Sequence, residues 1–220
     1  MPALPHDYNG MGTGMDSCPR VFVVDDDVSV LRAVGRLLRS SGFVVETFAS
    51  PASFLERLPY DGVACLILDM RMPGLSGLDV QKEVAAHAPS MPTLFLSGAS
   101  DVNSAATAMR KGAVDFLVKP IDAAQLVEAV SRALAAGAEA LRRRREEEEY
   151  SRRFARLTKR ERQVCDLVVQ GKLNKQIAYE LGTSEKTVKV HRARVMQKLE
   201  VDSVAALVWM VSRLRKDPPA

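Results

Sequence analysis

Polar residues that could handle a phosphoryl group follow four short apolar runs along the chain. They are Asp25, Asp26, Asp69, Ser97 and Lys119. Carboxylates placed together repel one another, which raises their pKa values unless a cation joins them. Mg²⁺ suits such a site because it prefers oxygen ligands and retains several waters. Asp69 would then be a nucleophile toward a phosphoryl donor, with Lys119 neutralising the phosphoryl oxygens and Ser97 donating a hydrogen bond to one of them.

Each of these residues has a simpler explanation when it is taken alone. Asp69 could merely solvate a strand end or begin a turn. The acidic run at residues 25–27 could supply negative charge to a helix N-terminus, and Lys119 could be a solvated side chain. Their joint placement after apolar runs favours one shared site.

Five apolar runs alternate with helical patterns between residues 20 and 136, and this alternation predicts the fold of the first domain. We expect strands near residues 21–24, 43–48, 63–69, 93–97 and 114–118, with helices capped at Ser29 and Ser50, a helix from Ser76 to about His87, and further helices at residues 102–111 and after Asp122. Right-handed crossovers then produce a parallel sheet covered by helices on both faces. The carboxyl ends of the strands meet at one edge of such a sheet, and the polar residues meet with them.

Residues 20 to about 136 resemble the receiver domain of a two-component response regulator. The segments VVDDD, LDMRMPG, FLSG and DFLVKP stand in the order and spacing of that family. The resemblance implies a five-stranded, doubly wound, flavodoxin-like α/β fold with Mg²⁺ as cofactor. It implies that Asp69 is the phosphoacceptor. The implied metal ligands are Asp26 directly, Asp25 through water, Asp69, and the backbone carbonyl of Arg71.

The same resemblance assigns roles around the phosphoryl group. Ser97 would be the switch hydroxyl, Lys119 the cation that contacts the phosphoryl oxygens, and Phe116 the aromatic residue that turns inward when the hydroxyl moves. Phe116 taken alone could be an ordinary core residue. The Lys119–Pro120 peptide bond is usually cis in such domains. Phosphorylation adds a charge of about −2, which would recruit Ser97 and Lys119.

Charge divides the 220-residue chain into an acidic and a basic part. Residues 1–137 contain 11 Lys and Arg against 15 Asp and Glu, whereas residues 138–220 contain 20 against 12. The basic part indicates a polyanionic partner such as nucleic acid. The three cysteines lack framework or metal-ligand spacing, and no segment is long and apolar enough to span a membrane. We therefore expect a cytoplasmic protein with no membrane partner.

The basic part predicts a separate, all-α domain of four helices. The caps of these helices are Thr158, which forms a capping box with Glu161, and then Asn174, Ser184 and Ser203. Two short helices separated by a Gly-Thr-Ser turn make a helix-turn-helix motif. The motif alone also fits a small helical interaction domain with a solvated basic face.

Residues 157–212 resemble the DNA-binding domain of the FixJ/NarL/LuxR family through LTKRERQV, GKLNKQIAYELGTSEKTVKVHRARVMQKL and SVAALV. The resemblance implies that the helix from Ser184 to Lys198 enters the major groove of DNA. Its exposed face is expected to carry Lys186, Lys189, Val190 and Ala193. The full set of predicted DNA-binding residues is Lys175, Lys186, Thr187, Lys189, Val190, Arg192 and Arg194, of which Lys175, Arg192 and Arg194 are expected at phosphates. His191 is expected to be structural, because this pattern offers it no second metal ligand.

Two segments outside these domains complete the predicted organisation. Residues 1–19 are rich in Gly, Pro and Met, and we expect a disordered extension there. Residues 137–156 are predicted to be a helical linker between a receiver at 20–136 and a DNA-binding domain at 157–216. Arg142 to Arg145 each precede a glutamate by four residues, which supports a solvated single helix, while Gly137 weakens it. Apolar residues are too few for a coiled-coil seam, so a plain spacer is favoured over a helix that changes its partner on activation.

The two resemblances together imply a phosphorylation-controlled DNA-binding regulator of transcription in a bacterial two-component system, an activator and not an enzyme. The expected partners are a sensor histidine kinase, double-stranded promoter DNA, RNA polymerase and, after phosphorylation, a second copy of the chain. One alternative is a phosphatase or phosphotransferase with an aspartyl-phosphate intermediate. Such an enzyme would commonly carry a second acid where this chain has Arg71. Another alternative is a DNA-binding protein whose receiver is not phosphorylated.

Overall fold

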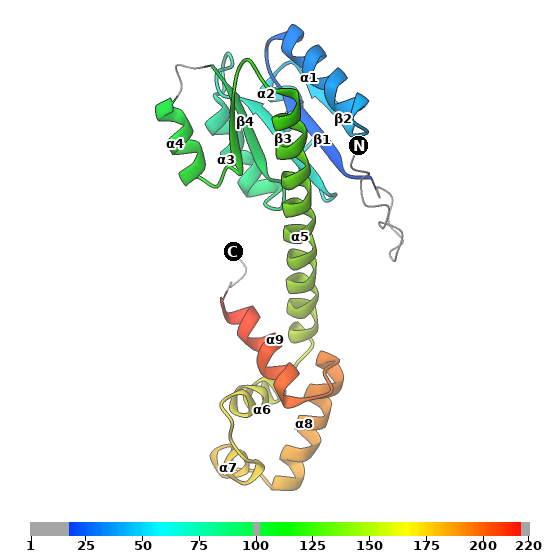
Figure 1. Ribbon diagram of the computed structural model, residues 1–220. Coiled ribbons are helices and arrows are strands. Elements are labelled where there is room, and N and C mark those ends of the chain that lie inside the picture. Colours follow the sequence, from blue (N-terminus) through cyan, green and yellow to red (C-terminus); the bar gives the residue numbers. More distant parts are fainter. Residues whose placement is uncertain (1–17, 99–101, 217–220) are drawn as a thin grey trace. The chain divides into compact units, whose positions relative to one another are not determined.

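The computed structural model describes residues 18–98 and 102–216 (Figure 1). The chain divides into two compact units, with the boundary between Leu141 and Arg142. The predicted disordered extension at residues 1–19 falls almost wholly outside the described residues. No helix in the described part of the chain is long and apolar enough to cross a membrane.

The first unit contains a parallel sheet of five strands in the order β2-β1-β3-β4-β5. The strands are β1 (Arg20–Val24), β2 (Val44–Phe48), β3 (Ala64–Asp69), β4 (Thr93–Ser97) and β5 (Asp115–Val118). Their helices are α1 (Val28–Ser40), α2 (Pro51–Leu55), α3 (Gly77–His87), α4 (Val102–Arg110) and α5 (Ala123–Ala155). The predicted doubly wound α/β fold is confirmed, with β3 at the centre of the sheet.

Helices cover the sheet on both faces, because successive strand residues point in opposite directions. On one face Val21, Cys65 and Leu94 pack in a core with side chains of α1 and α5. On the other face Phe22 and Leu66 pack in a second core with side chains of α2, α3 and α4. All six residues of β3 are buried, as expected for a central parallel strand. The carboxyl end of β3 is therefore held rigidly between two cores.

The helix caps of the first unit differ from the prediction at α1. Asp27, and not Ser29, is the N-cap, and its carboxylate accepts a hydrogen bond from the Ser29 N–H at 2.7 Å. The third acid of the VVDDD run thus starts a helix. Ser50 caps α2 as predicted. The third helix was predicted to begin at Ser76, and Ser76 is instead the N-cap of α3, where Asp79 completes a capping box with it.

Helix α5 is continuous across the predicted linker, and Gly137 does not interrupt it. A Cβ atom on Gly137 would lie 3.0 Å from the Ala64 carbonyl oxygen and 3.0 Å from Pro92 Cδ. The absent side chain therefore lets the helix backbone approach the amino ends of β3 and β4 closely. The expected ion pairs form beyond it, between Arg142 and Glu146 and between Arg144 and Glu148.

The second unit is helical, as predicted. It contains the last turns of α5 together with α6 (Lys159–Val169), α7 (Asn174–Glu180), α8 (Glu185–Leu199) and α9 (Val204–Lys216). The capping box of Thr158 with Glu161 is present, Ser184 caps α8, and the Ser203 hydroxyl accepts from the Ala206 N–H. The helix-turn-helix consists of α7 and α8.

The start of α7 differs from the prediction. The helix includes Asn174, its N-cap is Leu173, and the Gln176 side chain accepts the Leu173 N–H at 2.8 Å. Asn174 is therefore not the cap. The Asn174 side chain does not cap the helix because its oxygen accepts a hydrogen bond from Arg192 of α8 instead.

The last turns of α5 contribute to the core of the second unit. Tyr150 and Phe154 pack against this core, and Leu157 is buried in it. Arg153 pairs with Glu149 at 2.9 Å and with Glu200 at 3.1 Å. This end of the helix therefore does more than the plain spacer that the sequence favoured.

Candidate functional site

The predicted phosphoryl residues lie at one edge of the sheet. Asp25 follows β1, Asp69 ends β3, Ser97 ends β4 and Lys119 follows β5. Adjacent parallel strands end together, since Val24 pairs with Leu68, Asp69 with Leu96 and Ser97 with Val118. Residues that are far apart in the chain thus meet in space.

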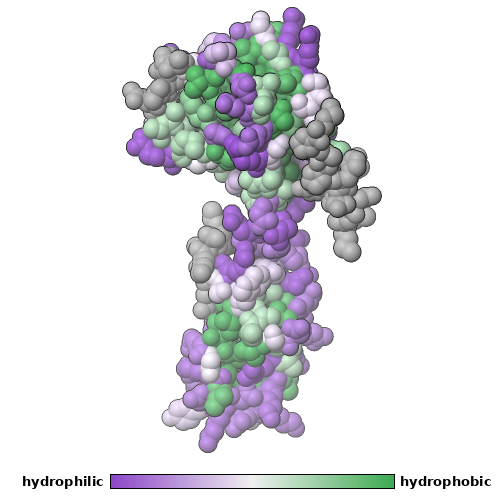
Figure 2. All heavy atoms as spheres, viewed as in Figure 1, coloured by the Kyte–Doolittle hydropathy of each residue, from purple (hydrophilic) through white to green (hydrophobic). Residues whose placement is uncertain are grey.

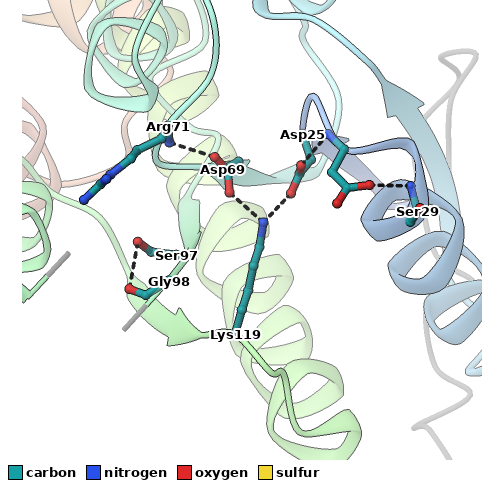
Figure 3. Close-up of polar contacts among 8 residues, drawn as sticks. Asp25, Ser29, Asp69, Arg71, Ser97, Gly98 and Lys119 are labelled. Atoms are coloured by element: carbon teal, nitrogen blue, oxygen red, sulfur yellow. Dashed lines mark hydrogen bonds and ion pairs between the residues drawn. The ribbon is translucent and has the colours of Figure 1, made fainter. Parts of the chain in front are cut away.

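Lys119 joins the two buried carboxylates of this edge (Figure 3). Its Nζ donates hydrogen bonds to Asp25 Oδ2 at 2.7 Å and to Asp69 Oδ1 at 2.7 Å. Asp25 is 1% exposed and Asp69 is 7% exposed, whereas Lys119 is partly open to solvent. The pocket therefore holds two negative charges against one positive charge.

Backbone N–H groups orient the other carboxylate oxygens. The Arg71 N–H donates to Asp69 Oδ2 at 2.7 Å, and the Asp27 N–H donates to Asp25 Oδ1 at 2.9 Å. Figure 3 shows the contact of Arg71 with Asp69. Each carboxylate is thus held at both oxygens, which aims the Asp69 side chain before any ligand arrives. The Lys119–Pro120 bond that follows is cis, as the resemblance implies.

Burial and charge shift the pKa values of this pocket in opposing ways. Burial raises the pKa of Asp25 above its ordinary value, although the hydrogen bond from Lys119 works against this rise. Burial would lower the pKa of Lys119, but its hydrogen bonds to Asp25 and Asp69 outweigh that effect and raise the pKa. Lys119 therefore remains a cation at neutral pH.

The other predicted residues of the first unit differ in their surroundings. Ser97 is 1% exposed, and its hydroxyl lies 3.4 Å from the Gly98 carbonyl oxygen. Asp26 is exposed beside the buried Asp25. Phe116 is half-buried and packs against the core that faces α3 and α4.

The pocket offers part of a Mg²⁺ coordination shell. Asp25 and Asp69 are oxygen donors that converge on one cation, and Asp26 follows Asp25 in the chain. Within residues 18–98 and 102–216, no group of three His, Cys, Asp or Glu side chains is already gathered as a metal cage. Such an open, oxygen-only donor set fits Mg²⁺, which keeps several of its waters.

The predicted DNA face of α8 is open to solvent. Lys186, Lys189, Val190 and Ala193 are exposed, while Val188 and Val195 point into the core. The face carries two ammonium groups, and Val190 on the same face is 45% exposed. Small side chains at positions 190 and 193 permit a close approach to the edges of bases.

The remaining predicted DNA residues differ in their surroundings. Lys175 and Arg194 are exposed. Arg192 Nη1 donates to Asn174 Oδ1 at 2.7 Å, so its guanidinium is held toward α7. The Thr187 hydroxyl lies 2.9 Å from that of the N-cap Ser184, which gives Thr187 a part in starting the helix.

Two residues illustrate what the sequence pattern could and could not indicate. The buried Nδ1 of His191 has no hydrogen-bond partner among the described residues, and its structural role stays a prediction. Asn174 was assigned to a cap, and its contact with Arg192 was missed. No sequence signal marks a pair 18 positions apart on two helices.

Comparisons with known proteins agree on both units. Residues 21–131 match the family of response regulator receiver domains, and residues 155–211 match the bacterial regulatory proteins of the luxR family. The response regulator protein TmoT of Ectopseudomonas mendocina is 42% identical over 195 residues, which cover 89% of this chain and 89% of TmoT.

The same likeness extends to further relatives. The transcriptional regulatory protein FixJ of Azorhizobium caulinodans is 44% identical over 191 residues, which cover 86% of this chain and 90% of FixJ. Among solved structures, the response regulator StyR is 44% identical, with a TM-score of 0.78 over 89% of this chain and 99% of that chain. The likeness therefore covers both units together.

Proposed function

Because the chain belongs to the response regulators that join a receiver domain to a LuxR-type DNA-binding domain, we propose that Asp69 is its phosphoacceptor. The protein is a transcription regulator controlled by phosphorylation, and the phosphatase alternative is not favoured. The observation that supports Asp69 is its contact with Lys119, 2.7 Å between Oδ1 and Nζ, at the end of the central strand.

The proposed reaction transfers a phosphoryl group from a histidine kinase to Asp69. An Asp69 carboxylate oxygen forms a bond to phosphorus while the P–N bond of the donor phosphohistidine breaks, and the histidine nitrogen leaves with the bonding electrons. Lys119 stays protonated because its pKa is raised, so it neutralises part of the incoming charge. The buried Ser97 hydroxyl is the donor on the neighbouring strand.

Mg²⁺ is the proposed cofactor of this reaction. Its ligands would be Asp26, Asp69 and the Arg71 carbonyl, with Asp25 acting through water. When bound, the ion would neutralise phosphoryl oxygens. Asp25 and Asp69 already converge on the Lys119 ammonium, which supports a site where negative charge needs a cation.

Promoter DNA is the proposed partner of α8. Lys186, Lys189 and Val190 would meet bases or adjacent phosphates in the major groove, since they form its exposed face. Thr187 would approach the groove from the first turn of α8. Lys175, Arg192 and Arg194 would meet phosphates, which position the protein without reading sequence.

Phosphorylation is proposed to favour a homodimer that binds an inverted-repeat operator and activates RNA polymerase in the cytoplasm. The half-buried Phe116 would turn inward as Ser97 moves, which would change the surface near β5 and favour pairing of two receivers. In the second unit, α9 leaves Val204, Val208 and Trp209 exposed, and Figure 2 shows apolar surface on this unit. Such a surface supports self-association, because it loses contact with water when two copies meet. No enzymatic turnover is proposed.

The phosphoacceptor is tested by substitution. We expect Asp69→Asn to abolish labelling by radioactive acetyl phosphate in the presence of Mg²⁺, because an amide cannot form the acyl phosphate. Asp115→Asn is the matched control, since Asp115 begins β5 at the opposite edge of the sheet and should leave labelling unchanged. Undiminished labelling of the Asp69→Asn protein would identify another acceptor.

A further inference from the structure

Gln81 of α3 is a buried polar residue that the proposed function does not use. It is 5% exposed, and its side chain reaches across to the end of α4. The Gln81 Nε2 donates to the Lys111 carbonyl oxygen at 3.2 Å and to the Ala108 carbonyl oxygen at 3.4 Å. The Ala108 carbonyl also accepts the N–H groups of Lys111 and Ala113, at 3.1 and 3.0 Å. The Lys111 carbonyl lies just beyond the last residue of α4, where carbonyls have no partner within the helix, so Gln81 supplies a donor there.

The surroundings determine which way the Gln81 amide points. Both neighbours at hydrogen-bond distance are carbonyl oxygens, which accept only, so the NH₂ group must face them. The Gln81 Oε1 is then buried without a hydrogen-bond partner among the described residues. Burying an oxygen without a hydrogen-bond partner destabilises the fold. That glutamine nevertheless stands at this position indicates that its two hydrogen bonds to the end of α4 serve a function.

The two hydrogen bonds from Gln81 hold the C-terminal end of α4 and do not act on its start. The Ala113 N–H donates to the Ala108 carbonyl at 3.0 Å across Gly112, whose φ of +90° closes the turn. Ala108 and Ala113 also share a core with Val84 of α3. The end of α4 is therefore attached to α3 by packing and by two hydrogen bonds.

Helix α3 is in turn attached to the backbone beside Asp69. The Gly77 N–H donates to the Met70 carbonyl at 3.2 Å, and a Cβ on Gly77 would lie 2.5 Å from the Asp69 carbonyl oxygen. The start of α4 follows β4, which ends at Ser97. The two ends of α4 are thus connected to the phosphoryl pocket by different routes, one through α3 and one through β4.

We propose that Gln81 is a positioning residue that holds the C-terminal end of α4 on α3. When Ser97 moves, α4 then rotates about this fixed end. The proposal rests on the proposed phosphorylation of Asp69. Without the anchor, displacement of Ser97 would be absorbed by slippage of α4 along α3. Less of the phosphorylation signal would then reach the surface where two receivers pair.

The test uses Gln81→Met in the full-length protein, because methionine keeps the length of the side chain and removes both the donors and the unpaired oxygen. Hydrogen exchange of the Lys111, Gly112 and Ala113 amides should become several-fold faster, since these amides close the end of α4. Beryllofluoride with Mg²⁺ should bind with unchanged affinity. Beryllofluoride should raise the dimerisation constant of the wild-type protein, and we call this increase the beryllofluoride gain. In the Gln81→Met protein this gain should be about five-fold smaller, as expected for the loss of hydrogen-bond coupling.

Two comparisons make the result decisive. Val84→Ala, in the same helix and core, removes packing but not the donors, so it should lower the melting temperature while reducing the beryllofluoride gain less than Gln81→Met does. Gln81→Glu places carboxylate oxygens against the two carbonyls and should reduce the gain at least as much as Gln81→Met. Unchanged exchange at the end of α4, or an unchanged gain in the Gln81→Met protein, would overturn the anchor. If the wild-type protein shows no gain, the proposed function fails, and the exchange rates alone decide whether Gln81 holds α4.

Discussion

At the scale of single residues, burial and charge have opposing effects on the side chains of the proposed phosphoryl pocket. Asp25 and Asp69 share one ammonium, that of Lys119, at 2.7 Å from each. Burial disfavours the charged form of Asp25 and raises its pKa, although the hydrogen bonds from Lys119 and the Asp27 N–H and the positive charge of Lys119 counter this effect. Binding chemistry, and not stability, therefore explains why a carboxylate stands at this position.

Asp25→Asn should stabilise the first unit in buffer free of divalent ions. Because the pKa of Asp25 is raised by burial, the folded protein holds this proton more tightly than the unfolded chain does. The stability from this group is fully present below the unfolded pKa of 3.8 and is lost as the pH rises through the folded pKa. Asparagine does not ionise and has no such loss. The free energy of unfolding of the Asp25→Asn protein should therefore exceed that of the wild-type protein by an amount that grows with pH, to about 1 kcal/mol near neutrality.

Calorimetry of the full-length proteins between pH 4 and pH 8 measures this difference. The transition of the first unit is assigned by hydrogen exchange of β1 and β3 amides. Added Mg²⁺ should stabilise the wild-type protein more than the variant, since one carboxylate of the proposed site is gone. If the stability difference between the two proteins shrinks as the pH rises, it would contradict the raised pKa of Asp25.

At the scale of elements, the caps of the helices were largely predictable and the bonds between helices were not. The capping box of Thr158 and Glu161 needs residues only three positions apart, and the structure contains it. The same Glu161 carboxylate also accepts from Lys198 of α8 at 2.6 Å. Lys198 further donates to the Arg156 carbonyl, so it ties the end of α8 to the start of α6.

Glu161→Gln should destabilise the second unit in a pH-dependent way. The hydrogen bond from Lys198 is the main reason that the pKa of Glu161 falls from 4.5 to about 2. A depressed pKa gives stability that is present above pH 4.5 and is lost as the pH falls toward about 2. The glutamine oxygen still accepts a hydrogen bond but carries no charge, so we expect a loss of about 1 to 2 kcal/mol at pH 7 that vanishes near pH 2.

Urea unfolding followed by fluorescence reports on this unit, because Trp209 is the single tryptophan of the chain and lies in α9. Glu185→Gln is the control, since Glu185 is exposed in the first turn of α8 and its change should cost less than about 0.5 kcal/mol. An equal loss at pH 2 and pH 7 would show that the charge of Glu161 is not responsible.

At the scale of the whole molecule, an acidic and a basic unit divide the work of receiving a signal and binding DNA. Helix α5 contributes residues to both cores, with Leu134 in the first and Phe154 in the second. The charge asymmetry, 11 basic against 15 acidic residues before position 138 and 20 against 12 after it, directs nucleic acid to the second unit. DNA binding should therefore depend strongly on salt.

Beryllofluoride with Mg²⁺ should convert the protein from monomer to dimer and raise its affinity for a duplex selected from a random pool. Two linked binding units gain affinity because the second contact becomes intramolecular. Molar mass from light scattering and titration of the labelled duplex measure the two effects. The Asp69→Asn protein should show neither, and a wild-type protein that stays monomeric with unchanged affinity would contradict the proposed control.

Lys189→Ala should weaken binding to the selected duplex by about ten-fold, because it removes one exposed cation from the side of α8 that we propose to face the groove. Lys159→Ala is the control, since it removes the same charge from an exposed position on α6. A reduced slope of affinity against salt would assign Lys189 to a phosphate, and relaxed sequence preference would assign it to a base. An unchanged titration would remove Lys189 from the interface.

Patterns that involve neighbouring residues were readable from the sequence. The alternation of apolar runs and helical segments predicted the five-stranded parallel sheet, and the common edge of such a sheet predicted that Asp25, Asp69 and Lys119 meet. Caps at Ser50, Thr158 and Ser184 were predictable because a cap depends on two or three adjacent positions.

Contacts between segments that are distant in the chain were decided only by the tertiary structure. Asn174 reaches Arg192, Gln81 reaches the end of α4, and Gly137 lies against the amino ends of two strands. The sequence showed each of these residues only in its local setting, as a helix cap, a helix residue or a helix breaker. Which role wins depends on the atoms that packing places beside the side chain, and local spacing does not specify those atoms.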